Sequence, residues 1–249
     1  MAIILTDFSG NGNTLTNNGG AEVTGLFAAS TTAVDFETTE SDYMTAIDSA
    51  SLSLSGDFTI EFWIKAESLA ATMGIVTKSD RDPTQNKKGY RIGITTAGDI
   101  FIEINETADD TTRDVVTWTL GLSTGVAYHV AISCDISEAT ATTFILYLDS
   151  VSQGNGTASV SGNCASINNN DIALHIGSEF NTGAADRFFD GIIDDVRIWS
   201  VVRTATEIAN NYTQVIPASP SNAVGYYPFE TPPAAGGNPM FFSGGITIG

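Results

Sequence analysis

Short hydrophobic segments with an alternating pattern recur along most of the chain, and they constrain its fold more than any other feature. In residues 58–65 (FTIEFWIK), every second side chain from Phe58 onward is hydrophobic, so these side chains share one face of an extended strand. Comparable runs occupy residues 90–94, 100–104, 115–120, 128–134, 143–149, 172–177 and 192–199. Turn sequences such as TTAGD (95–99) separate neighbouring runs and indicate β-hairpins. Strands that return after roughly 8–12 residues predict a β-sandwich or jelly roll.

Composition favours the same fold class. The chain contains 31 Thr, 16 Asn and 24 Gly; Thr suits a half-buried pleated surface, whereas Asn and Gly suit turns. A helix is predicted only at residues 204–212, where Thr204 can cap the N-terminus and Glu207 can complete a capping box. We therefore predict an all-β, two-sheet antiparallel jelly-roll sandwich with one short C-terminal helix.

Charge excludes several functions. The 249 residues include 10 Lys+Arg and 29 Asp+Glu, which gives a net charge of −19. Such a chain is not attracted to nucleic acid or to an anionic membrane, and it has no run of about 18 apolar residues for membrane insertion. The apolar patch at residues 2–5 is too short for a signal peptide and lacks a basic flank. Cys134 and Cys164 allow one disulfide, or else two buried thiols.

The composition changes only near residue 217. We assign residues 1–216 to the jelly-roll domain, because no repeat or linker interrupts them, and residues 217–249 to a C-terminal segment that begins with the linker-like PASPSN. A strand-like run at 224–230 and the apolar triplet 240–242 follow. This segment is either an ordinary last strand with a loose tail or a docking segment that forms a homo-oligomer through residues 224–249.

Several motifs, taken in order, carry a family resemblance. They are residues 7–13 (DFSGNGN), 58–64 (FTIEFWI), 127–132 (AYHVAI), 146–149 (LYLD) and 189–199 (FDGIIDDVRIW), followed by 203–208 (RTATEI). Over about residues 5–212 the chain resembles the laminin-G-like, concanavalin A-like jelly-roll family. The resemblance implies two curved antiparallel sheets, packed face to face. It also implies a carbohydrate-binding or adhesion module, although some relatives are glycoside hydrolases.

Hydrolysis of glycosides needs two carboxylates about 5–5.5 Å apart, or about 6.5–9.5 Å apart. Neither Glu61 with Glu67 nor Glu103 with Glu106 reproduces the carboxylate pattern of the related glucanases. His129 and His175, the two histidines of the chain, lie in alternating apolar segments and are expected to be structural. The sequence therefore predicts a protein that is not an enzyme, with glycoside hydrolase as the weakest of three alternatives.

The N-terminal motif is a candidate cation site. Asp7, Asn11 and Asn13 place oxygen ligands and flexible glycines within seven residues, which suits Ca²⁺. The resemblance adds Asp194, which the family would place beside this turn at a structural metal. The alternative is that residues 7–13 form an Asx-turn and that Asp194 pairs with Arg197.

Two loops are candidates for ligand binding. Half of the basic residues fall between 78 and 91, and the next hairpin carries acids and a tryptophan. We predict ligand contacts from Arg81, Asn86, Arg91, Glu106 and Trp118. The alternative is a pair of solvated loops with internal salt bridges. Trp63 and Trp199 are expected in the core.

These features favour a non-catalytic jelly-roll module of an extracellular particle, in particular a phage capsid decoration or tail-fibre protein, with glycan or another virion or cell-surface protein as partner. A secreted bacterial lectin or adhesin is the alternative. The expected location is therefore extracellular or on a virion. Structural Ca²⁺ is the expected cofactor.

Overall fold

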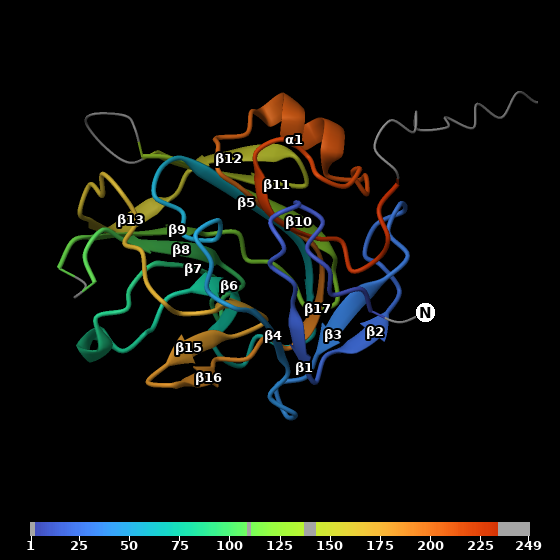
Figure 1. The fold of residues 1–249 in the computed structure, drawn as a ribbon, viewed down its shortest axis with the longest axis horizontal. Coiled ribbons are helices and arrows are strands. Elements are labelled where there is room, and N and C mark those ends of the chain that lie inside the picture. Colours follow the sequence, from blue (N-terminus) through green and yellow to red (C-terminus); the bar gives the residue numbers. More distant parts are fainter. Residues whose placement is uncertain (1–2, 109–110, 137–142, 234–249) are drawn as a thin grey trace, which may run out of the picture.

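Two antiparallel sheets packed face to face form the body of the protein (Figure 1). The structure is a computed structural model, and it describes residues 3–108, 111–136 and 143–233. Sheet A runs in the order β1 (Thr16–Asn18), β4 (Tyr43–Ala46), β14 (Leu174–Ile176), β6 (Met73–Lys78), β7 (Tyr90–Ile94), β8 (Ile100–Asn105), β9 (Arg113–Trp118), β13 (Thr157–Ser161). Sheet B runs in the order β12 (Val151–Asn155), β11 (Thr143–Leu148), β10 (Tyr128–Asp135), β5 (Phe58–Ala66), β17 (Gly191–Trp199), β3 (Ala33–Phe36), β2 (Ala21–Val23), with β18 (Ala223–Tyr227) also paired to β17. The predicted fold class is confirmed.

Smaller elements complete the fold. They are the hairpin β15 (Glu179–Asn181) and β16 (Ala184–Asp186), the 3-10 turn η1 (Pro83–Gln85) and the helix α1 (Ala205–Asn211). Within the described residues, no helix is long and apolar enough to cross a membrane.

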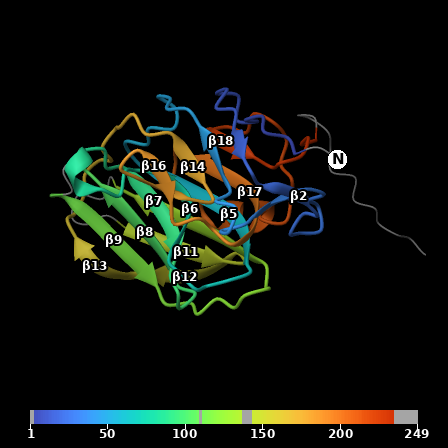
Figure 2. The ribbon, with the colours of Figure 1, turned by 90° about the horizontal axis from the view of Figure 1, so that it is seen from below.

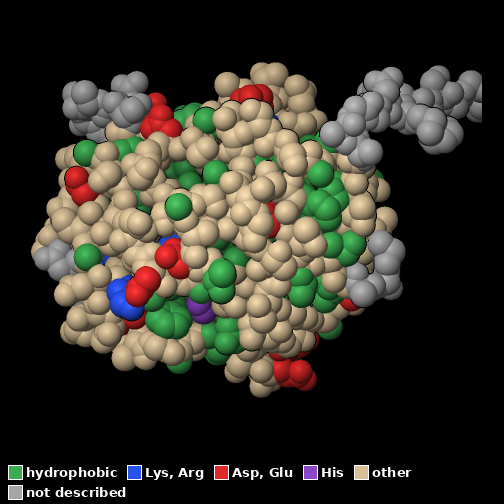
Figure 3. All heavy atoms as spheres, viewed as in Figure 1, with side chains coloured by type: hydrophobic (Ala, Val, Ile, Leu, Met, Phe, Trp, Pro, Cys, Tyr) green, Lys and Arg blue, Asp and Glu red, His purple; other side chains and the backbone are tan. Residues whose placement is uncertain are grey.

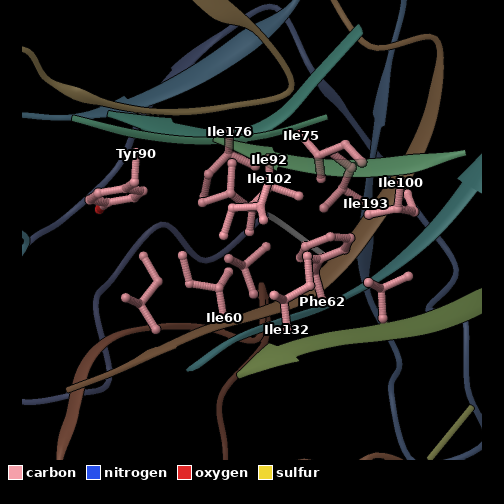
Figure 4. Close-up of a cluster of buried hydrophobic side chains, with 14 of the residues drawn as sticks. Ile60, Phe62, Ile75, Tyr90, Ile92, Ile100, Ile102, Ile132, Ile176 and Ile193 are labelled. Atoms are coloured by element: carbon pink, nitrogen blue, oxygen red, sulfur yellow. The ribbon is translucent and has the colours of Figure 1, made fainter. Parts of the chain in front are cut away.

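The core lies between the sheets, where one face of each strand is buried. Figure 4 shows Ile92 and Ile102 of sheet A directed toward Ile60 and Ile132 of sheet B. The alternation that predicted β5 explains this arrangement, because every second side chain enters the same layer. Trp63 and Trp199 are also buried, but on the opposite face of sheet B.

Helix α1 closes that outer face of sheet B. Thr204 and Glu207 form the predicted capping box, and Ile208 packs on Ala131 and Tyr147. Just after the helix, the carbonyl of Tyr212 accepts a hydrogen bond from Trp63 Nε1 at 2.8 Å. The two sheets therefore differ: helix α1 lies over sheet B, whereas the β15–β16 hairpin flanks sheet A.

Two alternatives that the sequence left open concern the cysteines and the C-terminal segment. Cys134 and Cys164 are both buried and are not joined in a disulfide, which confirms the interpretation as two small buried residues. The described part of the C-terminal segment joins its own sandwich, because β18 pairs with β17. The apolar triplet 240–242 lies outside the described residues.

Candidate ligand-binding face

The register of sheet A places a row of polar side chains across its outer face. His175 is the cross-strand partner of Thr45 and Thr77, Thr77 is opposite Arg91, and Arg91 is opposite Glu103. Their neighbours along each strand point into the core, so this row points away from it. Because adjacent strands lie about 4.8 Å apart, His175 and Arg91 are separated by about 10 Å. Figure 2 shows these strands from below as one layer of the sandwich.

The β15–β16 hairpin lies against this face and is fixed by backbone contacts. Gly74 of β6 donates to the carbonyl of Arg187 at 2.9 Å, and a Cβ at Gly74 would lie 2.6 Å from the backbone of Ser178. Only glycine allows this approach without a shift of the hairpin. On the other side, Arg81 donates its N–H to the carbonyl of Phe180 at 2.8 Å. The hairpin and the loop that carries Arg81 therefore form one unit.

Three arginines converge on one buried carboxylate, Glu179. Arg91 Nη1 lies 3.0 and 3.2 Å from the two oxygens of Glu179. Arg81 Nε lies 3.4 Å and Arg187 Nη1 3.6 Å from Oε2 of the same side chain. The Glu179 side chain is 2% exposed, whereas those of Arg81 and Arg187 are 31% and 35% exposed. The cluster therefore has its anion inside and two of its cations toward solvent.

Two further carboxylates complete the charge balance. Glu103 accepts from Arg91 Nη2 at 2.6 Å and from Asn105 Nδ2 at 3.2 Å. Asp186 accepts from Arg81 Nη2 and from the backbone N–H of Arg187. Burial alone would raise the pKa of both carboxyls, but the arginines and these hydrogen bonds hold each pKa below its usual value. Both carboxylates are therefore ionised at neutral pH.

Aromatic side chains lie beside the arginine cluster. The Tyr43 ring stacks on His175 with centroids 5.6 Å apart, and Phe188 lies 6.0 Å from Tyr43. Phe180, next to Glu179, lies 5.4 Å from His175 and connects the two groups. Tyr43, Phe180 and Phe188 are half-buried. Figure 3 shows a histidine among hydrophobic side chains on this face, next to basic and acidic ones.

His175 supports the aromatic group as a neutral ring. Its Nδ1 lies 2.9 Å from the hydroxyl of Ser178, just before β15. Burial lowers the pKa of His175 to about 4. The predicted structural role of this histidine agrees with its 4% exposure and its hydrogen bond.

The structure brings together two of the five predicted ligand contacts, Arg81 and Arg91, at Glu179. Asn86 is exposed at the end of η1 in a left-handed conformation, and Glu106 lies in the turn after β8, where Ala165 donates to it. Trp118 requires a correction. Its side chain is 3% exposed within the core, where Nε1 donates to Gly154, because it shares the inward parity of Val116.

Sequence reasoning missed Tyr43, Glu179 and Arg187. The hairpin that carries Glu179 and Arg187 had one usable signal, the turn at Thr182 and Gly183, which both adopt positive φ. Its strands have only three residues each, so they show no alternation that a sequence pattern could reveal.

The predicted cation ligands fall into two groups. Asp7 Oδ1 accepts from the backbone N–H groups of Ser9 and Tyr226, and Oδ2 accepts from the Ser9 hydroxyl and the N–H of Asn13. Asn11 and Asn13 donate to the carbonyls of β18 at Ala223 and Val224. Each oxygen of Asp7 thus accepts two hydrogen bonds, as expected for an Asx-type turn that ties the N-terminus to β18.

Asp194 has a different environment, at a bulge of β17 where Asp195 adopts a φ of 50°. One oxygen accepts from the N–H of Leu26, and the other is buried with no hydrogen-bond partner among the described residues. Burial, together with the charge of Asp195, raises the pKa of Asp194 to about 8. Nearby Glu230 also has one buried oxygen without a described partner, while its other oxygen accepts from Thr31.

The carboxylates considered for hydrolysis are arranged unfavourably for it. Glu61 is fully buried under α1, with Arg203 Nε at 3.3 Å and His129 Nε2 at 3.6 Å. Burial raises the pKa of Glu61. Glu67 is exposed and directly follows β5, and its carboxylate lies within 4.8 Å of those of Asp35 and Glu37. In the described part of the chain this is the only such acidic group.

Two antiparallel sheets packed face to face define a jelly-roll β-sandwich. A profile of the concanavalin A-like lectin/glucanases superfamily matches residues 38–209, so the chain belongs to this family. No curated protein sequence matches the chain.

Several solved structures share the fold. Domain 4 of AbnA, an arabinanase of Geobacillus stearothermophilus solved with arabinotriose, is 19% identical (TM-score 0.53) over 83% of this chain and 92% of that one. The Ruminococcus gnavus sialidase CBM40, solved with α2,3-sialyllactose, is 15% identical (TM-score 0.51) over 78% and 97%. A Bacteroides ovatus protein assigned to carbohydrate binding is 19% identical (TM-score 0.57) over 79% of this chain, which spans only 50% of that protein. At these identities the likeness shows the fold alone.

Proposed function

We propose that this protein is a non-catalytic glycan-binding module and that the outer face of sheet A is its binding face. The observation that carries the proposal is the position of an aromatic group beside an arginine cluster on that face. Saccharide sites combine flat apolar surface with a few fixed polar groups, and this face offers both. The likeness to modules solved with arabinotriose and α2,3-sialyllactose supports a saccharide as the ligand class.

The state of the carboxylates on this face supports a non-catalytic role. A glycoside hydrolase needs a general acid that keeps its proton near neutral pH. Glu103 and Asp186 have lowered pKa values and are held by arginines. Glu61, which has a raised pKa, is buried under α1 on the other sheet.

A glycan array tests the proposal. The wild-type chain is expected to bind a defined set of saccharides, and Tyr43→Ala is expected to lose at least tenfold in affinity because it removes half-buried aromatic surface. Val151→Ala is the matched control, since Val151 is an exposed hydrophobic residue on sheet B. Circular dichroism of each variant checks the fold. Equal binding by both variants, or turnover of a bound glycan that Glu103→Gln abolishes, contradicts the proposal.

The chemistry of the donor set also fits a structural Ca²⁺, with Asp194 as the central ligand. Asp194 and Glu230 each offer a buried oxygen that no described group satisfies, and carboxylate oxygens are the ligands Ca²⁺ prefers. The oxygens of Asp7 fit less well, because backbone and hydroxyl donors already occupy them. When bound, the ion would connect β17 to the C-terminal segment that carries Glu230.

Thermal melting in CaCl₂, MgCl₂ and EDTA tests the proposed Ca²⁺ site. Ca²⁺ is expected to raise the melting temperature of the wild type, and Asp194→Asn is expected to abolish that response. Asp7→Asn is the discriminating variant: it should lower the melting temperature with and without Ca²⁺, yet keep the response. If chelation leaves the wild type unchanged, the calcium site is wrong.

We further propose an extracellular setting, in a particle such as a phage virion, where the module is a decoration or tail-fibre component. The Thr- and Asn-rich strands and the apolar triplet at 240–242 support this setting. A secreted lectin or adhesin is the alternative. Immunoblotting of purified particles and of the particle-free supernatant separates them: recovery only in the supernatant contradicts the virion role.

A further inference from the structure

We infer that the binding face selects an acidic saccharide, with Arg81 and Arg187 as the residues that hold its carboxylate. The inference rests on the proposed glycan-binding function and adds the class of ligand. The preference for an acidic ligand depends on how the charges of the arginine cluster are arranged, not on the net charge of the cluster.

The cluster is neutral in total but not on its surface. Three arginines balance Glu179, Glu103 and Asp186, and the side chains of Glu179 and Glu103 are only 2% and 4% exposed. The side chains of Arg81, Arg187 and Asp186 are 31%, 35% and 39% exposed. A ligand that approaches this face therefore meets two guanidinium groups and one carboxylate, and the other two carboxylates are buried below them.

The acids of the cluster have little capacity left for a ligand, whereas the arginines retain donors. Asp186, the most exposed acid, has one oxygen bonded by Arg81 and the other by the N–H of Arg187. The Arg187 guanidinium reaches Glu179 only at 3.6 Å, beyond hydrogen-bond distance. A guanidinium has a fixed fork of N–H donors and no acceptor. The complementary group is thus a planar acceptor, and a carboxylate matches the fork in a bidentate manner.

The rest of the chain makes this position unusual. Net charge is −19, and three of the ten basic residues gather here. Elsewhere an anion is repelled by the overall field. Phe180 lies between the cluster and the Tyr43–His175 stack, so a sugar ring could pack on the aromatic group while its carboxylate meets the guanidinium groups.

Matched saccharide pairs test the inference by calorimetry on the full chain. The probes are α2,3-sialyllactose against lactose, and trigalacturonate against its methyl ester. The acidic member of at least one pair is expected to bind tenfold or more tightly than its neutral partner. Arg187→Gln should remove that preference, and Arg187→Lys should restore only part of it, because lysine supplies charge without the fork.

Lys87→Gln is the matched control, since Lys87 is a similarly exposed base that pairs with Asp171 away from Glu179. It should keep the wild-type preference. Equal affinity for acidic and neutral members overturns the inference, as does a preference that Arg187→Gln leaves intact. If neutral saccharides bind and Tyr43→Ala abolishes their binding, the glycan-binding function stands while the acidic class fails. If no saccharide on an array or in these pairs binds, both fail.

Discussion

Glu179 is the residue on which the proposed binding face most depends, and its replacement by Gln should be costly. The substitution keeps the shape of the side chain but removes the charge that three arginines face. Loss of one partner from a buried ion pair costs about 3–5 kcal/mol. Arg91 is 17% exposed and retains Glu103, which favours the lower end of that range. Arg81 and Arg187 are about a third exposed and add little, because solvent screens them.

The expected loss in the free energy of unfolding is therefore about 3 kcal/mol. For a chain of this size it corresponds to a fall in melting temperature of roughly 6–12 °C. Urea denaturation gives the free energy, and a double-mutant cycle with Arg91→Gln gives the coupling. Asp171→Asn is the control, because it breaks the exposed pair with Lys87 and should change stability by less than about 0.5 kcal/mol. If the free energy of unfolding of Glu179→Gln stays within about 0.5 kcal/mol of the wild type, the cluster does not hold the face together.

Three further predictions concern neighbouring features. Burial lowers the pKa of His175 to about 4, so the unfolded chain takes up the proton first as pH falls from about 6.5; the contribution of His175 to stability should drop by up to about 3 kcal/mol between pH 6.5 and 4, and urea midpoints of His175→Asn should lack that contribution. Gly74→Ala places a Cβ 2.6 Å from the backbone of Ser178; it should displace the hairpin, cost about 1–3 kcal/mol and weaken glycan binding, whereas unchanged calorimetry would contradict the packing described. Thr204→Ala removes the hydroxyl that accepts from the Glu207 N–H but keeps the backbone N–H that donates to the Glu207 carboxylate; it should cost about 1 kcal/mol with glycan binding intact, as melting curves and calorimetry can check.

The parts of the fold that local sequence determines could be predicted. The alternation at residues 58–65 gave β5 and its core face, the turn at 95–99 gave the β7–β8 hairpin, and Thr204 with Glu207 gave the helix cap. In each case the residues that interact are only a few positions apart, so the pattern can be recognised in the amino-acid sequence.

The binding face could not be predicted in the same way, because distant pairing creates it. Arg91 and Glu179 are 88 residues apart, and their contact depends on the register of β6 and β14 and on the docking of a short hairpin. The motif at residues 7–13 shows a related ambiguity. The oxygen-rich spacing that suits a cation also suits an Asx-type turn, and in the structure Asp7 accepts four hydrogen bonds in such a turn.

Binding of a saccharide to the outer face of sheet A is best tested by a crystal structure of the full chain with the tightest-binding saccharide from the array. Density for a sugar ring is expected against Tyr43 or Phe180, with a polar substituent within hydrogen-bond distance of Arg81 or Arg187. Density in the hollow between α1 and residues 216–222 instead, with the face of sheet A bare, would show that the binding face lies elsewhere.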